Sequence, residues 1–100
     1  MNVVDSSGWL EYFADTVYAD YFAEAIEDID SLIVPAITIY EVYKRLYAQK
    51  GRDIALEATA YMQSGKVVDL DAGLAIEAAE FSSDNKVPMA DSIIYVLYQI

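Results

Sequence analysis

Short apolar runs that alternate with helical patterns predict an α/β chain. Three runs are rich in β-branched or other apolar side chains and read as buried strands: residues 2–4, 31–34 and 66–70. Elsewhere, apolar residues recur every three or four positions and predict helices over residues 18–29, 39–47, 54–62, 72–81 and 88–100. The cap-forming residues 5–7 start a further helix. Helices that follow each strand are typical of a parallel sheet flanked by helices.

The apolar stripes of these helices predict which side chains face the core. One stripe consists of Tyr18, Tyr21, Phe22, Ala25, Ile26 and Ile29, with acids between its members. The next consists of Ile39, Val42, Tyr43, Leu46 and Tyr47. The helix at 88–100 is apolar on nearly every side, a pattern that is typical of a buried helix.

Composition narrows the class of protein. A length of 100 residues suits one domain, so we expect residues 1–100 to form a single domain. The hydrophobic fraction of 56% indicates a packed core rather than disorder, despite the net charge of -11. The absence of Cys and His excludes disulfides, thiolate and histidine metal sites, and Ser–His–Asp catalysis. The sequence has neither a membrane span of roughly 20 apolar residues nor a signal-peptide pattern, so we expect a cytoplasmic protein.

Charge is distributed unevenly along the chain. Residues 1–43 contain nine acids and no base, and four of the six bases then follow at Lys44, Arg45, Lys50 and Arg52. One interpretation is a solvated acidic face followed by cations near a helix C-terminus. The other is an acidic surface for a basic protein partner, with a small cationic rim for an anionic substrate. The overall charge makes nonspecific binding to nucleic acid unfavourable.

Three acids lie where the predicted fold directs them to one edge of the sheet. Asp5 directly follows the first strand, Glu41 lies in the helix after the second, and Asp91 begins the helix beyond the third. Ligands of open parallel sheets bind outside the carboxyl ends of the strands. In a chain without His or Cys, three such carboxylates predict a site for a hard metal ion.

Each of these acids also has a purely structural interpretation. Asp5 is placed to cap the first helix, and Asp91 is favourable in the positive first turn of its helix. Glu41 is placed to pair with Arg45 at the i,i+4 spacing on an exposed helix face. The sequence leaves both interpretations open for each residue.

Three segments resemble the leading acidic motifs of PIN-domain ribonucleases. They are residues 3–7 (VVDSS), 35–42 (PAITIYEV) and 87–94 (VPMADSII), and they match in order and spacing. The similarity is greatest to VapC-type toxins of toxin–antitoxin systems. The resemblance implies a PIN-like three-layer fold with a central parallel sheet. It also implies a metal-dependent endoribonuclease that acts on RNA, is inhibited by a cognate antitoxin and forms a homodimer.

The resemblance assigns roles to individual residues. Asp5 and Asp91 would be the principal ligands of Mg²⁺ or Mn²⁺, and Glu41 would bind a second ion directly or through water. Such ions activate water and offset the charge of the phosphodiester. Ser6 is a candidate to orient Asp5. Lys44 and Arg45 are candidates for contacts with substrate phosphates.

The chain departs from the family pattern near its C-terminus. Family members continue into a further strand and a Thr/Ser-x-Asp motif that supplies another acid, whereas this sequence stops at Ile100. We therefore expect a C-terminally truncated PIN domain that lacks the last strand, binds metal weakly and has impaired activity. Because the last strand is missing, we also expect one edge of the sheet to be exposed.

A non-catalytic module is the alternative to a nuclease. The acidic, aromatic-rich residues 9–29 offer a surface for an antitoxin or for a second copy of the chain. A helical aromatic stripe of this kind is also compatible with a simple core.

Overall fold

Three short parallel strands form the centre of the computed structural model, which describes residues 1–98. The strands are β1 (Asn2–Val3), β2 (Leu32–Pro35) and β3 (Lys66–Val68), in the sheet order β1-β2-β3. Val3 lies opposite Ile33, and Val34 lies opposite Val67. The predicted α/β class with a parallel sheet is confirmed.

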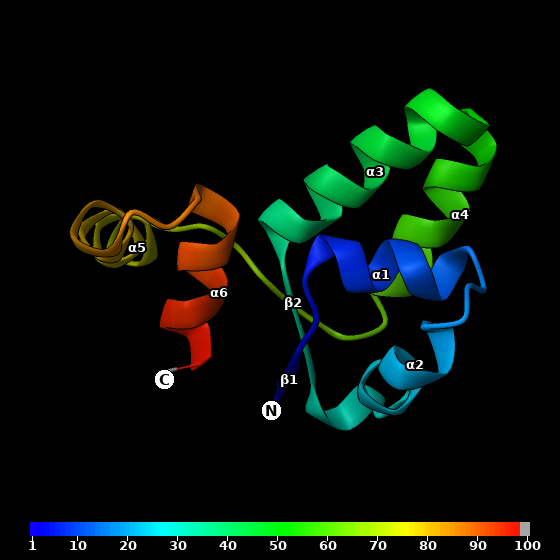
Figure 1. The fold of residues 1–100 in the computed structure, drawn as a ribbon, viewed down its shortest axis with the longest axis horizontal. Helices are drawn as coiled ribbons and strands as arrows, with labels where there is room; N and C mark the ends of the chain where they lie inside the picture. The colour runs from blue at the N-terminus through cyan, green and yellow to red at the C-terminus, as the bar shows by residue number, and fades with distance from the viewer. Residues whose placement is uncertain (99–100) are drawn as a thin grey trace.

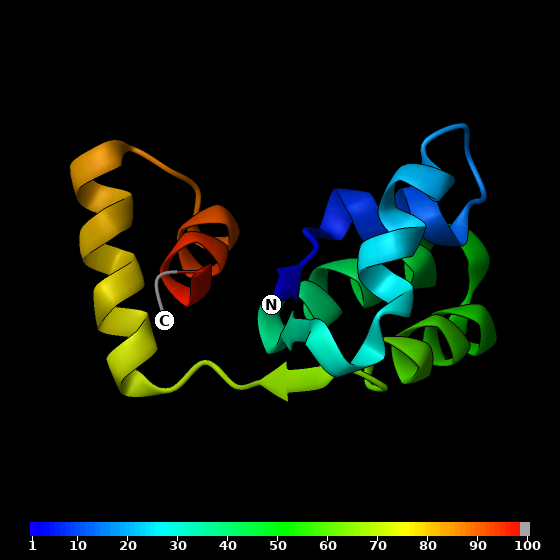
Figure 2. The ribbon, with the colours of Figure 1, turned by 90° about the horizontal axis from the view of Figure 1, so that it is seen from below.

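Six α-helices within residues 1–98 cover the two sides of these strands. They are α1 (Ser6–Phe13), α2 (Ala19–Glu27), α3 (Ala36–Lys50), α4 (Arg52–Met62), α5 (Ala72–Asn85) and α6 (Met89–Tyr98), with a short 3-10 helix η1 (Ile29–Ser31) before β2. Figures 1 and 2 show α1 to α4 on one side of the strands and the α5–α6 pair on the other. None of these helices has the length and hydrophobicity that a membrane crossing requires.

Several element boundaries differ from the prediction. The third strand ends at Val68 rather than at residue 70, because Leu70 is exposed and the chain turns away toward the cap of α5. Helix α5 continues to Asn85 instead of residue 81, and Lys86 ends it with a left-handed φ of 56°. The last helix begins at Met89, and the final two residues of its predicted range, 99 and 100, lie outside the described residues.

The larger core is built around Trp9, which is completely buried on α1. Its ring stacks on Phe13 with 5.6 Å between centroids, and Tyr12 and Tyr61 meet it edge-on at 6.4 and 6.5 Å. The strands, α2, α3 and α4 complete this core with Val4, Ile26, Leu32, Val34, Val42, Leu46, Ala55, Ala58 and Met62. Helix α1 is therefore fixed between the sheet and α4.

Two predicted core stripes are wrong in part. On α3 the buried positions are Thr38, Val42 and Leu46, at the i,i+4,i+8 spacing, so Tyr47 lies on the opposite, exposed side. On the short α2, Ala19 and Ile26 take the buried positions, and the tyrosines at 18 and 21 are exposed. Small or aliphatic residues take the buried positions of α2, and on α3 only Tyr43 among the tyrosines packs against the core.

A second, smaller core joins α5 to α6. Its buried members are Leu74, Ala78, Ile93, Val96 and Leu97, and Ile37 and Val68 connect it to the rest of the fold. The rings of Phe81 and Tyr95 stack with centroids 4.0 Å apart. Helix α6 is not enclosed on every side as predicted, because Met89 and Tyr95 are exposed.

Gly8 permits the close approach of α1 to Val4, which follows β1, and to α2, and its replacement is a test of that packing. A Cβ atom there would lie 2.6 Å from Val4 Cγ1 and 2.9 Å from Phe22 Cδ1. We expect Gly8→Ala to lower the free energy of unfolding by about 1–3 kcal/mol, measured by urea denaturation.

Gly73 provides the matched control for this substitution. A Cβ on Gly73, in the first turn of α5, meets nothing nearer than Asp71 Oδ1 at 3.6 Å. Gly73→Ala should stabilise the protein by about 0.5–1 kcal/mol, because alanine loses less backbone entropy in a helix. Equal effects of the two substitutions would contradict the tight packing at Gly8.

The hydroxyl of Tyr12 gives the fold a pH dependence. It lies 3.4 Å from the Tyr61 hydroxyl and donates to Glu27 Oε2 at 3.1 Å. The Tyr61 hydrogen bond, then burial and the Glu27 carboxylate, raise the pKa of Tyr12 well above its usual value. The unfolded chain releases this proton at lower pH, so stability falls as pH rises above about 10. We expect Tyr12→Phe to flatten this decline in urea denaturation; an unchanged slope would contradict it.

Candidate functional site

Asp5 lies directly after β1 and caps α1. Its backbone is extended, with φ −74° and ψ 171°, and its Oδ1 accepts a hydrogen bond of 2.8 Å from the Gly8 amide. The side chain is exposed, and the cap uses one of its two carboxylate oxygens. The capping interpretation is therefore confirmed, and the second oxygen faces no partner within the described part of the chain.

Glu41 lies in a hollow of about 380 Å³ between α1 and α3, here called the α1–α3 hollow. The hollow is lined by Ser6, Leu10, Tyr40, Glu41, Lys44, Arg45 and Ala48. Glu41 is half-buried, and it forms no ion pair with Arg45 or with another base in residues 1–98. The structure thus brings Glu41 together with all three residues predicted to contact substrate or orient the site: Ser6, Lys44 and Arg45.

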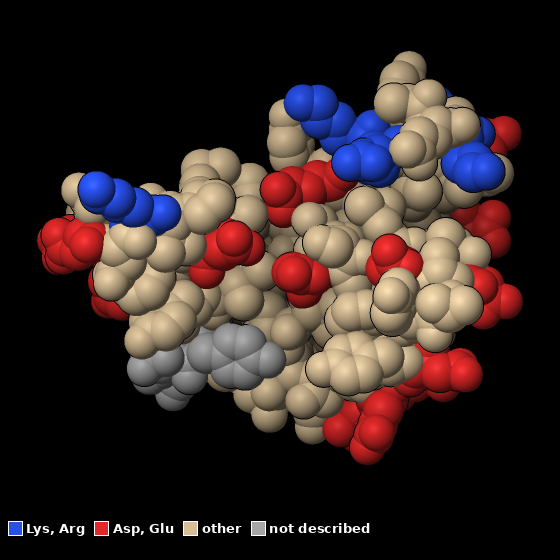
Figure 3. All heavy atoms as spheres, viewed as in Figure 1, with Lys and Arg blue, Asp and Glu red and all other residues tan. Residues whose placement is uncertain are grey.

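Asp91 lies outside the α1–α3 hollow, in the first turn of α6, where its charge is favourable. It is exposed, and its side chain has no hydrogen-bond or ion-pair partner in the described residues. Figure 3 shows acidic side chains over α1, α3 and α6 on the same face of the molecule. Glu41 and Asp91 are the only acids of α3 and α6.

The donor set can be compared with the needs of a hard metal ion. All three predicted ligands offer carboxylate oxygens, the donors that Mg²⁺ and Mn²⁺ prefer. In residues 1–98, however, no group of three or more acids lies close enough together to hold one ion. The donor chemistry therefore fits, whereas the spacing allows at most two of these carboxylates on a single ion.

Comparison with known proteins identifies the family. The family profile of the PIN domain matches residues 3–99, a range that includes Asp5, Glu41 and Asp91. The chain belongs to the PIN-domain family. PIN domains are nucleases, and they generally use divalent metal ions. No curated protein matches the chain.

Two residues of α3 in this PIN domain lie close to Glu41 along the helix and were not predicted from the sequence. Thr38 lies one turn before Glu41, and its buried Oγ1 has no hydrogen-bond partner among the described residues. Tyr40 precedes Glu41 and lines the α1–α3 hollow. The sequence signal for Tyr40 is its i,i+4 spacing to Lys44, whereas the predicted apolar stripe of this helix contains Tyr43 and Tyr47 but not Tyr40.

The capping role of Asp5 can be separated from its charge. Asp71 caps α5 with the same geometry, since its Oδ1 accepts from the Leu74 amide at 2.8 Å, and it serves as the matched control. We expect Asp5→Ala and Asp71→Ala each to lower the free energy of unfolding by about 1 kcal/mol in urea denaturation. The Asn variants should retain most of the stability. A gain in stability from Asp5→Ala would show that carboxylate repulsion outweighs the cap.

Proposed function

We propose that this PIN domain is a metal-dependent endoribonuclease of the VapC type that acts in the cytoplasm. The observation that carries the proposal is the α1–α3 hollow, where Glu41 lies beside Ser6 and the cations Lys44 and Arg45. A carboxylate suited to a hard ion and cations suited to phosphates are the groups that RNA hydrolysis requires in a chain without His or Cys.

In this proposal, Asp5, Glu41 and Asp91 hold Mg²⁺ or Mn²⁺. Asp5 and Asp91 are the principal ligands of one ion, and Glu41 binds a second ion directly or through water. When bound, such an ion lowers the pKa of a water molecule and offsets the charge of the phosphodiester. The availability of the carboxylates supports the assignment, because Glu41 and Asp91 have no side-chain partner within residues 1–98.

Lys44 and Arg45 contact the phosphates of the substrate. Both are exposed and lie on α3 within about one turn of Glu41. Neither forms an ion pair with an acid in the described residues, so both cations are available to an anion. Ser6, the first residue of α1, orients Asp5 in the same proposal.

A basic antitoxin and a second copy of the chain are the proposed protein partners. Figure 3 shows acidic side chains around α2, and residues 1–43 contain no base. Charge complementarity of this kind steers a basic partner to the surface. A groove of about 950 Å³ between α1, α3 and α4, lined in part by Leu10, Phe13 and Ile54, has apolar area for such a partner.

A non-catalytic PIN-like module that binds an antitoxin or dimerises is the second candidate. One observation favours it: no three acids within residues 1–98 are close enough to share an ion. Titration of the protein with Mn²⁺ in a calorimeter distinguishes the two candidates. Binding that is lost in Asp5→Asn supports the nuclease, and no binding supports the module.

Cleavage of RNA tests the proposed activity. We expect the protein to cleave single-stranded RNA only when Mg²⁺ or Mn²⁺ is added, as followed by gel electrophoresis. Asp5→Asn should lower the rate by at least about 100-fold, because the ion contributes several kcal/mol of transition-state stabilisation. The cap of α1 remains in this variant, since Asn is as good a capping residue as Asp.

Asp71→Asn is the control for the cleavage experiment. It makes the same change in charge at an equivalent cap, on α5 rather than on α1. Its rate should equal that of the unmodified protein. Metal-independent cleavage, or equal rates for Asp5→Asn and Asp71→Asn, would rule out the proposed site.

A further inference from the structure

The outer side of α3 carries a row of three tyrosines, of which only Tyr43 packs against the larger core. Tyr40 and Tyr47 are 59% and 55% exposed, and Tyr43 between them is half-buried. These rings line a shallow hollow of about 640 Å³ together with Ala36, Ile39 and Lys44. We call this surface the tyrosine face.

The rings of the tyrosine face are already arranged for stacking. Tyr43 and Tyr47 lie nearly parallel, with an angle of 21° between planes and 5.8 Å between centroids. The Lys44 ammonium lies over the Tyr40 ring at 5.8 Å from its centroid, within range of a cation–π contact. An aromatic surface with a cation beside it is the arrangement that binds a base and its phosphate together.

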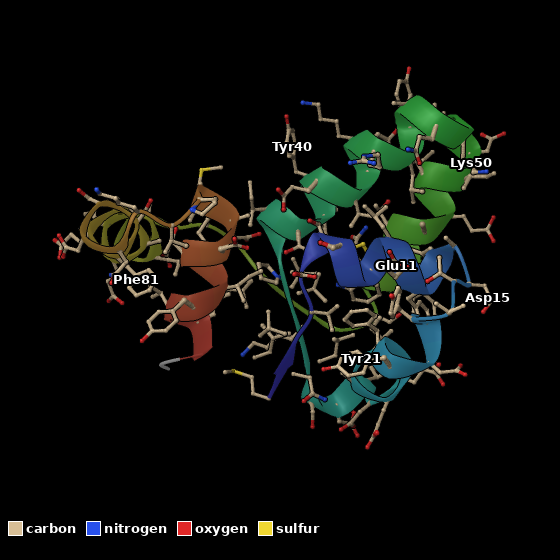
Figure 4. All side chains as sticks on the ribbon, in the orientation of Figure 1. Glu11, Asp15, Tyr21, Tyr40, Lys50 and Phe81 are labelled. Carbon is tan, nitrogen blue, oxygen red and sulfur yellow. The ribbon has the colours of Figure 1, made fainter. Side chains whose placement is uncertain are left out.

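The tyrosine face is continuous with the α1–α3 hollow that holds Glu41. Tyr40 and Lys44 line both hollows and form the ridge between them. Figure 4 shows Tyr40 projecting outward from α3, away from α1. A flexible chain bound in one hollow therefore passes directly into the other.

The local charge favours a polyanion as the occupant. Four of the six bases of this acidic chain fall within residues 44–52, and Figure 3 shows Lys and Arg gathered over α3. The helix dipole accounts for Lys50, the only base in the last turn of α3, but not for Lys44 or Arg45. Neither of these two has an acidic partner among the described residues.

We propose that the tyrosine face is a platform on which unpaired bases of single-stranded RNA stack, while Lys44 and Arg45 bind the adjoining phosphates. The proposal rests on the proposed ribonuclease function and adds to it a binding surface on α3 outside the α1–α3 hollow. Bases within a duplex are already stacked on one another and cannot lie on Tyr40 or Tyr47. The platform is sequence-tolerant, because every base has an aromatic face.

Binding without metal tests the platform separately from cleavage. The probe is a fluorescein-labelled oligouridylate of roughly 12 nucleotides, a length within the site sizes of single-strand binders, and anisotropy is read in EDTA. Tyr40→Leu and Tyr47→Leu should each weaken binding by roughly 5- to 150-fold, the effect of one lost stacked base. A labelled RNA duplex of the same length should bind more weakly than the single strand.

Matched variants identify the cause of any loss of RNA affinity. Tyr40→Phe keeps the ring and should bind as the unmodified protein does. Tyr21→Leu removes a tyrosine that is 81% exposed on the acidic α2 and should leave binding unchanged. Figure 4 shows Tyr21 on α2, far from Tyr40. Lys44→Gln should reduce the slope of log affinity against log salt by about 0.7, the contribution of one phosphate.

Three results would overturn the platform. If Tyr40→Leu and Tyr21→Leu bound the oligouridylate equally well, bases would not stack on Tyr40. If the duplex bound as tightly as the single strand, the surface would have no preference for unpaired bases. A Tyr40→Leu variant that turns a dimer into a monomer with unchanged RNA affinity would assign the face to a second copy of the chain. Binding in EDTA by a protein that never cleaves RNA would instead contradict the proposed function and leave the platform intact.

Discussion

The complete burial of Trp9 is the interaction on which the position of the candidate site depends. Trp9 lies on α1, stacks on Phe13 and meets a ring of α4 edge-on, so α1 cannot shift without opening the larger core. Burial of a side chain of this size is worth several times the thermal energy. Because Asp5 and Ser6 begin the same helix, the aromatic core fixes them beside α3.

On helix α3, the residues that pack in the core and the residues proposed to act in function lie on different sides. Thr38, Val42 and Leu46 face the core, and the opposite side carries the tyrosines. Glu41 and Arg45 lie between these two sides and border α1. One helix therefore presents a carboxylate, cations and aromatic rings on neighbouring surfaces without any exposed loop.

The sequence predicted the class of fold and the identity of the cap residues well, because both depend on local chemistry. The alternation of strands and helices and the cap at Asp5 are confirmed, and Asp71 caps α5 in the same way. Which side of each helix faces the core was less predictable. Tyr47 continues a plausible apolar stripe, and only the packing of α3 against the sheet and α4 shows that the stripe is shifted by one position.

The candidate site was also predictable only in part from the sequence. Order along the chain placed Glu41 near Ser6, Lys44 and Arg45, since α1 and α3 both start at the carboxyl ends of neighbouring strands. The spacing of the three acids depends on tertiary distances that a sequence does not contain. Asp91 in particular is carried by α6, whose position is set by its contact with α5.

Asp91 is carried by the separate core of α5 and α6, unlike the other two acids. Asp5 and Glu41 are carried by helices of the larger core, whereas Asp91 belongs to a helical pair that meets that core mainly through Ile37 and Val68. Cooperative units of this kind open and shift with their own free energies. The placement of Asp91 relative to the other two carboxylates therefore depends on the packing of Ile37 and Val68, two residues outside the site.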